Sequence, residues 1–363
     1  MQLKQLSIQQ FKNLKSLELS FSEKINCLVG RNGIGKTNVL DAIYYLSFTK
    51  SYLNAVDQLN VAHGFEEFSI KGKYTRKDET ETILCAYKKG QKKTVKRNQK
   101  SYKKLQDHIG LFPLVIISPA DRDLIIEGAE TRRKFIDGVI AQSNKVYLDE
   151  LLQYNRLLSQ RNALLKYFQA NHTFDEDSLL VYDHQLDKLA KSIYQARKEF
   201  TDLLSPKVAE FYAKLANNKE RVSLEYQSKL EQDELVNLLA RCRDKDRLVG
   251  HTTVGIHKDD LVFHLDNYPI RKFGSQGQQK SFLVALKLAQ FELIAEQSGI
   301  KPLLLLDDVF DKLDEHRVAA LVELVNQDFF GQIFITDTHA NRTEDIVKRM
   351  SANYEMINME TYA

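Results

Sequence analysis

A glycine-rich loop near the start of the chain and an acidic strand end near its finish constrain the fold most. The loop, residues 30–37, fits the pattern G-x-x-x-x-G-K-[ST] in full. An apolar run, residues 25–29, precedes it, and residues 39–46 resume with helical spacing. Strand, glycine loop and helix in this order form a P-loop. The sequence therefore predicts an α/β fold with a phosphate-binding loop at the end of one strand.

The residue types in the loop suit phosphate binding. Glycines let the backbone curl until its N–H groups face a phosphate, and the positive end of the following helix dipole adds to the attraction. Lys36 is expected to reach the β and γ phosphates of ATP, and the Thr37 hydroxyl to ligate Mg²⁺. The expected nucleotide-binding residues are Gly30, Arg31, Asn32, Gly33, Ile34, Gly35, Lys36, Thr37 and Asn38.

The second half of the expected site is the acidic strand end. Residues 303–306 are all leucine, which is typical of a buried parallel strand, and Asp307 and Asp308 follow them. Sheets of this kind bind ligands at the carboxyl ends of their strands. Asp307 is the expected Mg²⁺ carboxylate, and Asp308 is placed to orient or deprotonate the attacking water. A helix N-cap would explain one of these acids but not the pair.

A third segment, residues 272–279, lies just upstream of the acidic strand and reads KFGSQGQQ. A serine and a glycine at a helix start can hold a second anion. The segment resembles the signature loop of ABC-type ATPases, which closes over the γ-phosphate held by the P-loop of another subunit. The resemblance implies a catalytic contact from Ser275 and nucleotide contacts from Gly277 and Gln278. The alternative is a glycine-rich helix start used only for packing.

Further motifs narrow the family. Two strand-like alternations, residues 3–11 and 13–21, precede the P-loop strand, as in the SMC and RecF group of DNA-associated ATPases. The longer runs are 118–121 (SPAD), 131–137 (TRRKFID), 154–166 (YNRLLSQRNALLK), 257–261 (HKDDL) and 274–281 (GSQGQQKS). Together they resemble the RecF family of bacterial recombination-repair ATPases along nearly the whole chain.

The chain departs from these patterns at three places. The family string Gly-Pro-His-Arg-Asp-Asp stands here as Gly-Ile-His-Lys-Asp-Asp in residues 255–260. ABC ATPases carry Glu after the metal-binding Asp, whereas this chain has Asp308, whose shorter side chain draws the carboxylate back. Slow hydrolysis is the expected result. The switch histidine expected after the last core strand corresponds to either Asp337 or His339.

The resemblance implies a function and partners. ATP with Mg²⁺ would drive two heads into a homodimer that clamps gapped DNA at a junction of single and double strands. A RecR-type mediator, with RecO and RecA in the same pathway, would act with it, and weak DNA-stimulated ATP hydrolysis would reset the clamp. Two alternatives remain: the ATPase head of a DNA-end-processing nuclease complex, and a transport ATPase subunit. The second is disfavoured because its nucleotide motifs usually lie closer together and it needs a membrane partner.

The middle of the chain accounts for the distance between the nucleotide motifs. Apolar residues at 3-4 spacing predict two antiparallel helices, residues 145–168 and 178–205, that form an arm inserted into the head. Pro206 is expected to end or bend the second helix, and Arg161 to snorkel out of the apolar seam. The predicted fold is an ABC-type P-loop ATPase head, α/β with a mixed sheet and flanking helices, carrying a helical arm. The expected domains are a head in residues 1–127, the arm in 128–248, and the rest of the head in 249–363.

Positive charge gathers in one segment. Residues 71–104 contain thirteen Lys or Arg against three Asp or Glu, within a β-rich stretch, residues 65–105. This segment is either a basic β-ribbon that follows a phosphate backbone or a solvated hairpin whose lysines protect an edge strand. Charge alone favours neither interpretation, while the family resemblance favours DNA contact.

Composition agrees with a cytoplasmic protein without membrane partners. The net charge of +3 is too small to establish nucleic-acid binding by itself. No apolar run approaches the roughly 20 residues that a membrane helix needs. Cys27, Cys85 and Cys242 have no metal-ligand spacing, so we expect buried, reduced thiols.

Overall fold

A computed structural model describes residues 1–77, 79–216, 220–310, 315–325, 329–351 and 353–362. The chain divides into two compact units. The head contains Met1–Asp121, Phe211–Lys219 and Gln276–Ala363, and the arm contains Arg122–Glu210 and Glu220–Ser275. Residues 249–275, expected in the head from the sequence, lie in the arm unit. No helix in the described parts of the chain is long and apolar enough to cross a membrane.

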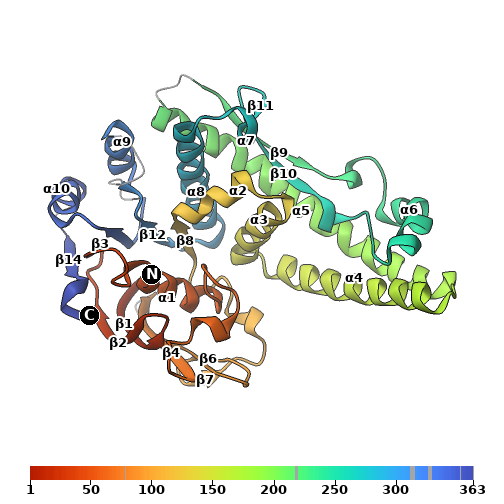
Figure 1. Cartoon of the computed structure of the whole chain (residues 1–363). Coiled ribbons are helices and arrows are strands. Elements are labelled where there is room, and N and C mark those ends of the chain that lie inside the picture. Colours follow the sequence, from red (N-terminus) through yellow and green to blue (C-terminus); the bar gives the residue numbers. More distant parts are fainter. Residues whose placement is uncertain (78, 217–219, 311–314, 326–328, 352, 363) are drawn as a thin grey trace. The chain divides into compact units, whose positions relative to one another are not determined.

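The first sheet of the head is antiparallel and has the strand order β2-β1-β4-β5-β6-β7 (Figure 1). Its strands alternate: Ile70, Gly72 and Tyr74 are buried, while Lys71 and Lys73 between them are exposed. One face therefore packs on the core and the other meets water. The strands are β1 (Gln2–Phe11), β2 (Leu14–Ser20), β4 (Glu67–Arg76), β5 (Glu79–Lys88), β6 (Thr94–Arg97) and β7 (Lys100–Ser101).

The second sheet is parallel throughout, with the order β14-β3-β13-β12-β8. It combines strands from both ends of the chain, and the P-loop strand β3 lies between β13 and β14. Every residue of β3, β12 and β13 is buried, as continuous apolar runs in a parallel sheet require. The strands are β3 (Ile25–Val29), β8 (Leu114–Ile117), β12 (Leu303–Asp307), β13 (Ile333–Asp337) and β14 (Tyr354–Asn358).

Helix α1 (Lys36–Phe48) contacts strands of both sheets, so it forms the middle layer of the head. Helix α8 (Gln276–Ser298) is buried on nearly all sides from Ser281 to Phe291, which is typical of a core helix. The described part of the head also contains α9 (Glu315–Val325), α10 (Ala340–Met350) and the short turns η1 (Asp57–Asn60), η2 (Leu105–His108), η3 (Pro119–Arg122) and η7 (Met359–Tyr362).

The arm combines long helices with a three-stranded antiparallel sheet of order β11-β10-β9. Its helices are α2 (Asp123–Ile126), α3 (Ala129–Ser143), α4 (Lys145–Asn171), α5 (Glu176–Ala216), α6 (Leu235–Val249) and α7 (Ile270–Phe273). The end of α5, from Phe211 onward, is counted with the head. Its strands and short turns are β9 (Val222–Gln227), β10 (Asp260–Leu265), β11 (Tyr268–Pro269), η4 (Lys229–Glu231) and η5 (Ile256–Lys258).

Helices α4 and α5 run antiparallel. Side-chain hydrogen bonds join residue 161 to 183, 150 to 192 and 147 to 197, so the partner number falls as the α4 number rises. Helix α5 continues through Pro206 to Ala216, so this proline does not end the helix. A proline inside a helix removes one backbone hydrogen bond. Helices in proteins are stabilised mainly by packing of their apolar faces, and Leu204 and Val208 on either side of Pro206 are buried.

Arg161 does not snorkel. Its side chain is fully buried, its Nε donates to Asp183 Oδ1 at 2.6 Å, and its Nη1 donates to Asp246 Oδ2 at 2.8 Å. Nη1 also donates to Thr252 Oγ1 at 2.8 Å. Burying an unpaired charge is prohibitive, and two buried carboxylates remove that obstacle here. The guanidinium therefore joins α4, α5 and α6.

We expect Arg161→Ala to destabilise the arm by about 3–5 kcal/mol, because it leaves Asp183 and Asp246 buried without their shared cation. Arg156, which is exposed on the same helix, supplies the matched control, and Arg156→Ala should change stability by less than about 0.5 kcal/mol. Urea unfolding combined with amide hydrogen exchange across α4–α6 measures both. Equal losses in the two variants would contradict a central role for the buried pair.

Candidate nucleotide site

The P-loop has the backbone geometry that its glycines allow. Gly30, Gly33 and Gly35 have φ angles of 148°, 81° and 113°, which residues with a Cβ atom rarely adopt. A Cβ atom at Gly35 would also lie 2.6 Å from Leu14 Cδ2. Glycine is therefore required where the loop turns into helix α1.

A residue that sequence reasoning missed supports the loop from the β1–β2 turn. Asn13 Nδ2 donates to the carbonyl oxygen of Gly33 at 2.9 Å, and Asn38 Nδ2 donates to Asn13 Oδ1 at 2.7 Å. The sequence predicts that Asn38 contacts the nucleotide. In the structure, the Asn38 side chain fixes the position of the Asn13 side chain. Of the other expected loop residues, Arg31 and Asn32 are exposed and Ile34 is half-buried.

Lys36 and Thr37 both point into the head at the start of α1. Lys36 Nζ donates to the carbonyl oxygens of Gly30 at 2.7 Å and Arg31 at 3.1 Å, so the ammonium lies within the curve of the loop. The Thr37 hydroxyl donates to Asp307 Oδ1 at 2.9 Å. This hydrogen bond joins the two halves of the site, whose residues are far apart in the sequence.

The acidic strand end is held by Thr336 on the neighbouring strand β13. Its hydroxyl donates to Asp307 Oδ1 at 2.8 Å and accepts the backbone N–H of Asp308 at 3.0 Å. Burial raises the pKa of Asp307, while hydrogen bonds from Thr336 and Thr37 act in the opposite direction. Asp308 has a φ of 47°, an uncommon conformation for a residue with a side chain, and such strain clusters at functional sites.

These residues fit a magnesium ion. A hydroxyl and a carboxylate lie within 2.9 Å of each other, and both are hard oxygen ligands. Among the residues that the structure describes, no three His, Cys, Asp or Glu side chains cluster as a metal site. A cation at Thr37 and Asp307 would therefore complete its coordination with nucleotide phosphates and water, which is the usual arrangement for Mg²⁺.

The two candidate switch residues differ in their surroundings. Asp337 is buried, accepts the backbone N–H of His339 at 2.9 Å, and pairs with Arg342 through both carboxylate oxygens at 3.0 and 2.9 Å. His339 is exposed and lines a cavity of about 610 Å³ at the start of α10. The Asp337 carboxylate is thus engaged in contacts that order the turn before α10, whereas the His339 side chain is exposed.

The signature-like segment forms the beginning of α8. Ser275 is exposed just before that helix, while Gly277 and Gln278 in its first turn are half-buried. A Cβ atom at Gly277 would lie 2.9 Å from Arg317 Nη1, so a larger residue would displace that side chain. Residues 311–314, which follow the acidic strand end and Phe310, lie outside the described residues.

A buried ion pair connects α8 to the P-loop helix, and sequence reasoning missed it. Lys287 Nζ lies 2.6 Å from Asp121 Oδ1, and both side chains are buried. The Tyr52 hydroxyl donates to the same oxygen at 2.8 Å, and the Tyr52 backbone N–H donates to Asp41 Oδ1 on α1 at 2.6 Å. The helix that begins at the signature segment is therefore linked to the helix that begins at the P-loop.

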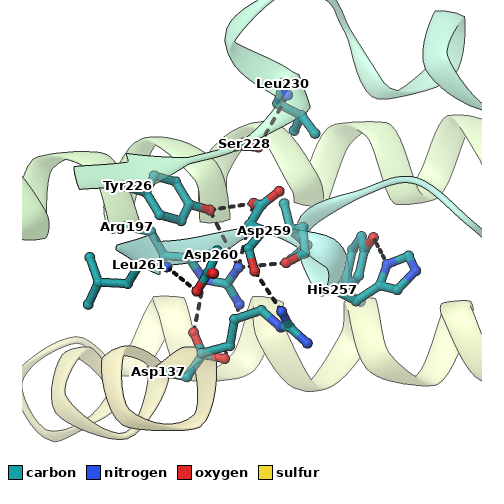
Figure 2. Close-up of polar contacts among 12 residues, drawn as sticks. Asp137, Arg197, Tyr226, Ser228, Leu230, His257, Asp259, Asp260 and Leu261 are labelled. Atoms are coloured by element: carbon teal, nitrogen blue, oxygen red, sulfur yellow. Dashed lines mark hydrogen bonds and ion pairs between the residues drawn. The ribbon is translucent and has the colours of Figure 1, made fainter. Parts of the chain in front are cut away.

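A second polar cluster lies within the arm, at the motif of residues 255–260 (Figure 2). Arg197 pairs with both carboxylate oxygens of Asp137 at 2.9 and 3.0 Å and donates to the Ile256 carbonyl oxygen at 2.8 Å. The Tyr226 hydroxyl donates to Asp259 Oδ2 at 2.5 Å. Burial opposes the charged form of Arg197, yet Asp137 holds its pKa well above the usual value. The motif thus binds α3, α5, β9 and β10 together.

His257 in this motif is structural. Its Nε2 lies 3.2 Å from the Thr252 carbonyl oxygen, which can only accept, so Nε2 carries the proton. Its Nδ1 then accepts from the Tyr154 hydroxyl at 3.1 Å. Burial lowers the pKa of His257 to about 4, so the ring is neutral at physiological pH.

A P-loop joined to an acidic strand end, in a head interrupted by a helical arm, defines an ATPase head of the SMC type. Residues 2–361 match the family described as RecF/RecN/SMC N terminal domain. The chain belongs to the RecF family, which confirms the resemblance and the fold class read from the sequence.

Individual relatives match along nearly their whole length. The DNA replication and repair protein RecF of Flavobacterium johnsoniae is 55% identical over 359 residues, which cover 99% of this chain and 100% of that protein. The protein of the same name from Porphyromonas gingivalis is 42% identical over 363 residues, covering 99% and 98%.

Solved structures agree with the fold. A structure of the recombination mediator protein RecF with ATP, from the RecFOR pathway, superposes with a TM-score of 0.87 at 32% identity and covers 93% of this chain and 92% of that one. An Smc head bound to the winged-helix domain of ScpA superposes at 0.59 with 14% identity, covering 98% and 94%. The second likeness concerns the fold alone.

We expect the stability of the arm to fall between pH 6.5 and 4 because of His257. An unfolded histidine gains its proton near pH 6.5, whereas the folded ring stays neutral until about pH 4. The unfolded state therefore binds more protons in this window, and stability rises with pH by up to about 3 kcal/mol across it. In His257→Gln, which keeps one donor and one acceptor, that part of the slope should disappear. Unfolding free energies measured from pH 4 to 7 test this, and parallel curves would refute it.

Proposed function

We propose that this protein is an ATP-dependent, DNA-binding protein of recombinational repair and replication restart, located in the cytoplasm. The observation that carries the proposal is the hydrogen bond between Thr37 and Asp307, because it joins the P-loop to the acidic strand end, and together these would form one Mg²⁺-nucleotide site. Gly30 to Asn38 would cradle the phosphates, Lys36 would contact the β and γ phosphates, and Thr37 with Asp307 would hold Mg²⁺. Asp308 would orient or deprotonate the attacking water.

The nucleotide would act by joining two heads. Ser275 is exposed at the start of a helix, where a partner's γ-phosphate would meet the positive end of the helix dipole, with Gly277 and Gln278 beside it. The complete site would then exist only in an ATP-bound homodimer. Slow hydrolysis would follow from the short side chain and strained backbone of Asp308, and would reset the dimer.

The DNA that this dimer holds is proposed to be gapped duplex. The names of relatives, DNA replication and repair protein RecF, support a role in DNA repair, as does the solved RecF structure described for the RecFOR pathway. A RecR-type mediator, together with RecO, would use the clamp to load RecA next to the gap. His339, which faces outward beside the site, is the proposed switch residue that senses the nucleotide.

The outer face of the antiparallel sheet is the proposed DNA contact within the basic segment. Cross-strand register places Lys71, Leu84 and Lys96 abreast on β4, β5 and β6, with Lys73 one step along β4. These strands lie inside the sheet, so edge protection does not account for Lys71 and Lys73. Five of the other basic residues of the segment are paired: Arg76 and Arg97 with Glu81, Lys88 with Glu67, Lys89 with Glu66, and Lys93 with Asp57.

Light scattering with and without ATP-Mg²⁺ tests the dimer. The wild type should double its mass with ATP, Lys36→Ala should stay monomeric, and Ser275→Arg should bind ATP without dimerising. Asp308→Asn should keep the dimer longer because hydrolysis is lost. Adding gapped duplex and blunt-ended duplex in parallel separates a gap clamp from an end-processing head. A wild type that binds ATP but remains monomeric in every condition would refute the clamp.

We expect the triple variant Lys71→Gln, Lys73→Gln, Lys96→Gln to weaken DNA binding and to reduce the slope of log K against log salt by about 0.9 for each duplex phosphate that the lysines no longer neutralise. The control is Lys88→Gln with Lys89→Gln, which removes lysines that face glutamates. Fluorescence anisotropy over a salt series gives both slopes. An unchanged slope in the triple variant would show that these lysines do not contact DNA.

A further inference from the structure

The short turn η7 lies directly against the P-loop. Strand β14 pairs in parallel with β3, and the last pair in the register is Asn358 with Val29. The next residues on the two strands therefore come side by side, which places Met359 and Glu360 next to Gly30 and Arg31. A Cβ atom at Gly30 would be 3.5 Å from Glu360 Oε1 and 3.5 Å from Met359 Cβ, so this backbone is already in van der Waals reach of η7.

Glu360 makes two contacts with the loop. Its Oε1 accepts the backbone N–H of Arg31 at 2.9 Å, and its Oε2 lies 3.4 Å from Arg31 Nε. The Arg31 side chain is 74% exposed, so its ion pair with Glu360 contributes little by itself. The hydrogen bond to the backbone is the contact that restrains the loop.

The element that carries Glu360 is fixed. Met359 is 1% exposed and belongs to the core between the two sheets of the head. Asn358 Oδ1 accepts the backbone N–H of Glu360 at 3.0 Å, and the Asn358 carbonyl oxygen accepts the Thr361 hydroxyl at 2.7 Å. The carboxylate is thus presented to the P-loop from a rigid turn.

Lys36 contacts the carbonyl oxygens of the same backbone segment whose N–H group binds Glu360. Its ammonium donates to the carbonyl oxygens of Gly30 and Arg31, so the position of Nζ depends on where these two peptide groups are held. We infer that Glu360 is a positioning residue of the nucleotide site: it fixes the entry of the P-loop and, through it, the ammonium of Lys36 that meets the ATP phosphates. This inference rests on the proposed ATP site and assigns that site a residue outside all its sequence motifs.

A carboxylate near a polyphosphate site also repels the ligand, and this effect opposes the positioning effect. The Arg31 guanidinium beside Glu360 offsets its charge. At about 0.15 M salt the Debye length is roughly 8 Å, so repulsion across exposed surface is largely screened. The short-range hydrogen bond is therefore expected to outweigh the repulsion.

The test compares Glu360→Ala, which removes the acceptor, with Glu360→Gln, which keeps an acceptor and removes the charge. The control is Glu355→Ala, an exposed carboxylate on β14. At 0.15 M salt, Glu360→Ala should raise the calorimetric Kd for ATP-Mg²⁺ and the KM of hydrolysis about fivefold, the worth of one hydrogen bond of about 1 kcal/mol. Its kcat should stay within about twofold, because Asp307 and Asp308 are untouched. Glu360→Gln and Glu355→Ala should retain a Kd within about twofold of the wild type.

Each other outcome counts against the inference. Tighter ATP binding in both Glu360 variants would show that repulsion dominates and that the carboxylate opposes nucleotide. Unchanged Kd and KM in Glu360→Ala would show that Glu360 does not position Lys36, even if thermal stability fell. Lys36→Ala distinguishes a failure of the proposed ATP site from a failure of the role assigned to Glu360. If the wild type binds no ATP, the proposed function fails, whereas ATP binding that is abolished in Lys36→Ala but intact in Glu360→Ala overturns only the role of Glu360.

Discussion

The hydrogen bond between Thr37 and Asp307 depends on the order of strands in the parallel sheet. Strand β13 lies between β3 and β12, so the helix that follows β3 starts close to the carboxyl end of β12. The Thr336 hydroxyl on β13 bridges the interval by contacting both Asp307 and the backbone of Asp308. A slip of one residue in any of these pairings would turn a buried strand side chain to the other face and separate the three groups.

In both units, several buried cationic side chains are paired with carboxylates. In the arm, Arg161 and Arg197 are each matched by carboxylates from other helices, and in the head Lys287 is matched by Asp121. Such pairs add little net stability over apolar packing, but breaking one is costly, so they favour one arrangement of helices over others. The arm helices, whose apolar seams alone would tolerate sliding, are thereby held in one register.

Much of the nucleotide site could be predicted from the sequence because its residues are contiguous. The P-loop and the acidic strand end each carry a complete local pattern, and the structure brings Lys36, Thr37 and Asp307 together. Asn13, Thr336 and Glu360 could not be found in this way, since each acts through a single contact set by strand register. The snorkelling predicted for Arg161 is wrong for the same reason: its partners lie 22 and 85 residues away, and no local spacing reveals them.

The P-loop is consequently supported from three separate parts of the head. Asn13 holds the carbonyl oxygen of Gly33, Glu360 holds the N–H of Arg31, and Asp307 holds the hydroxyl of Thr37. These partners come from the β1–β2 turn of the antiparallel sheet, from the turn after β14 and from strand β12 of the parallel sheet. A loop restrained at its entry, middle and exit loses little conformational entropy when phosphate binds, so the head presents its N–H groups in place. Through the same contacts a bound nucleotide would act on both sheets of the head at once, as the proposed joining of two heads would require.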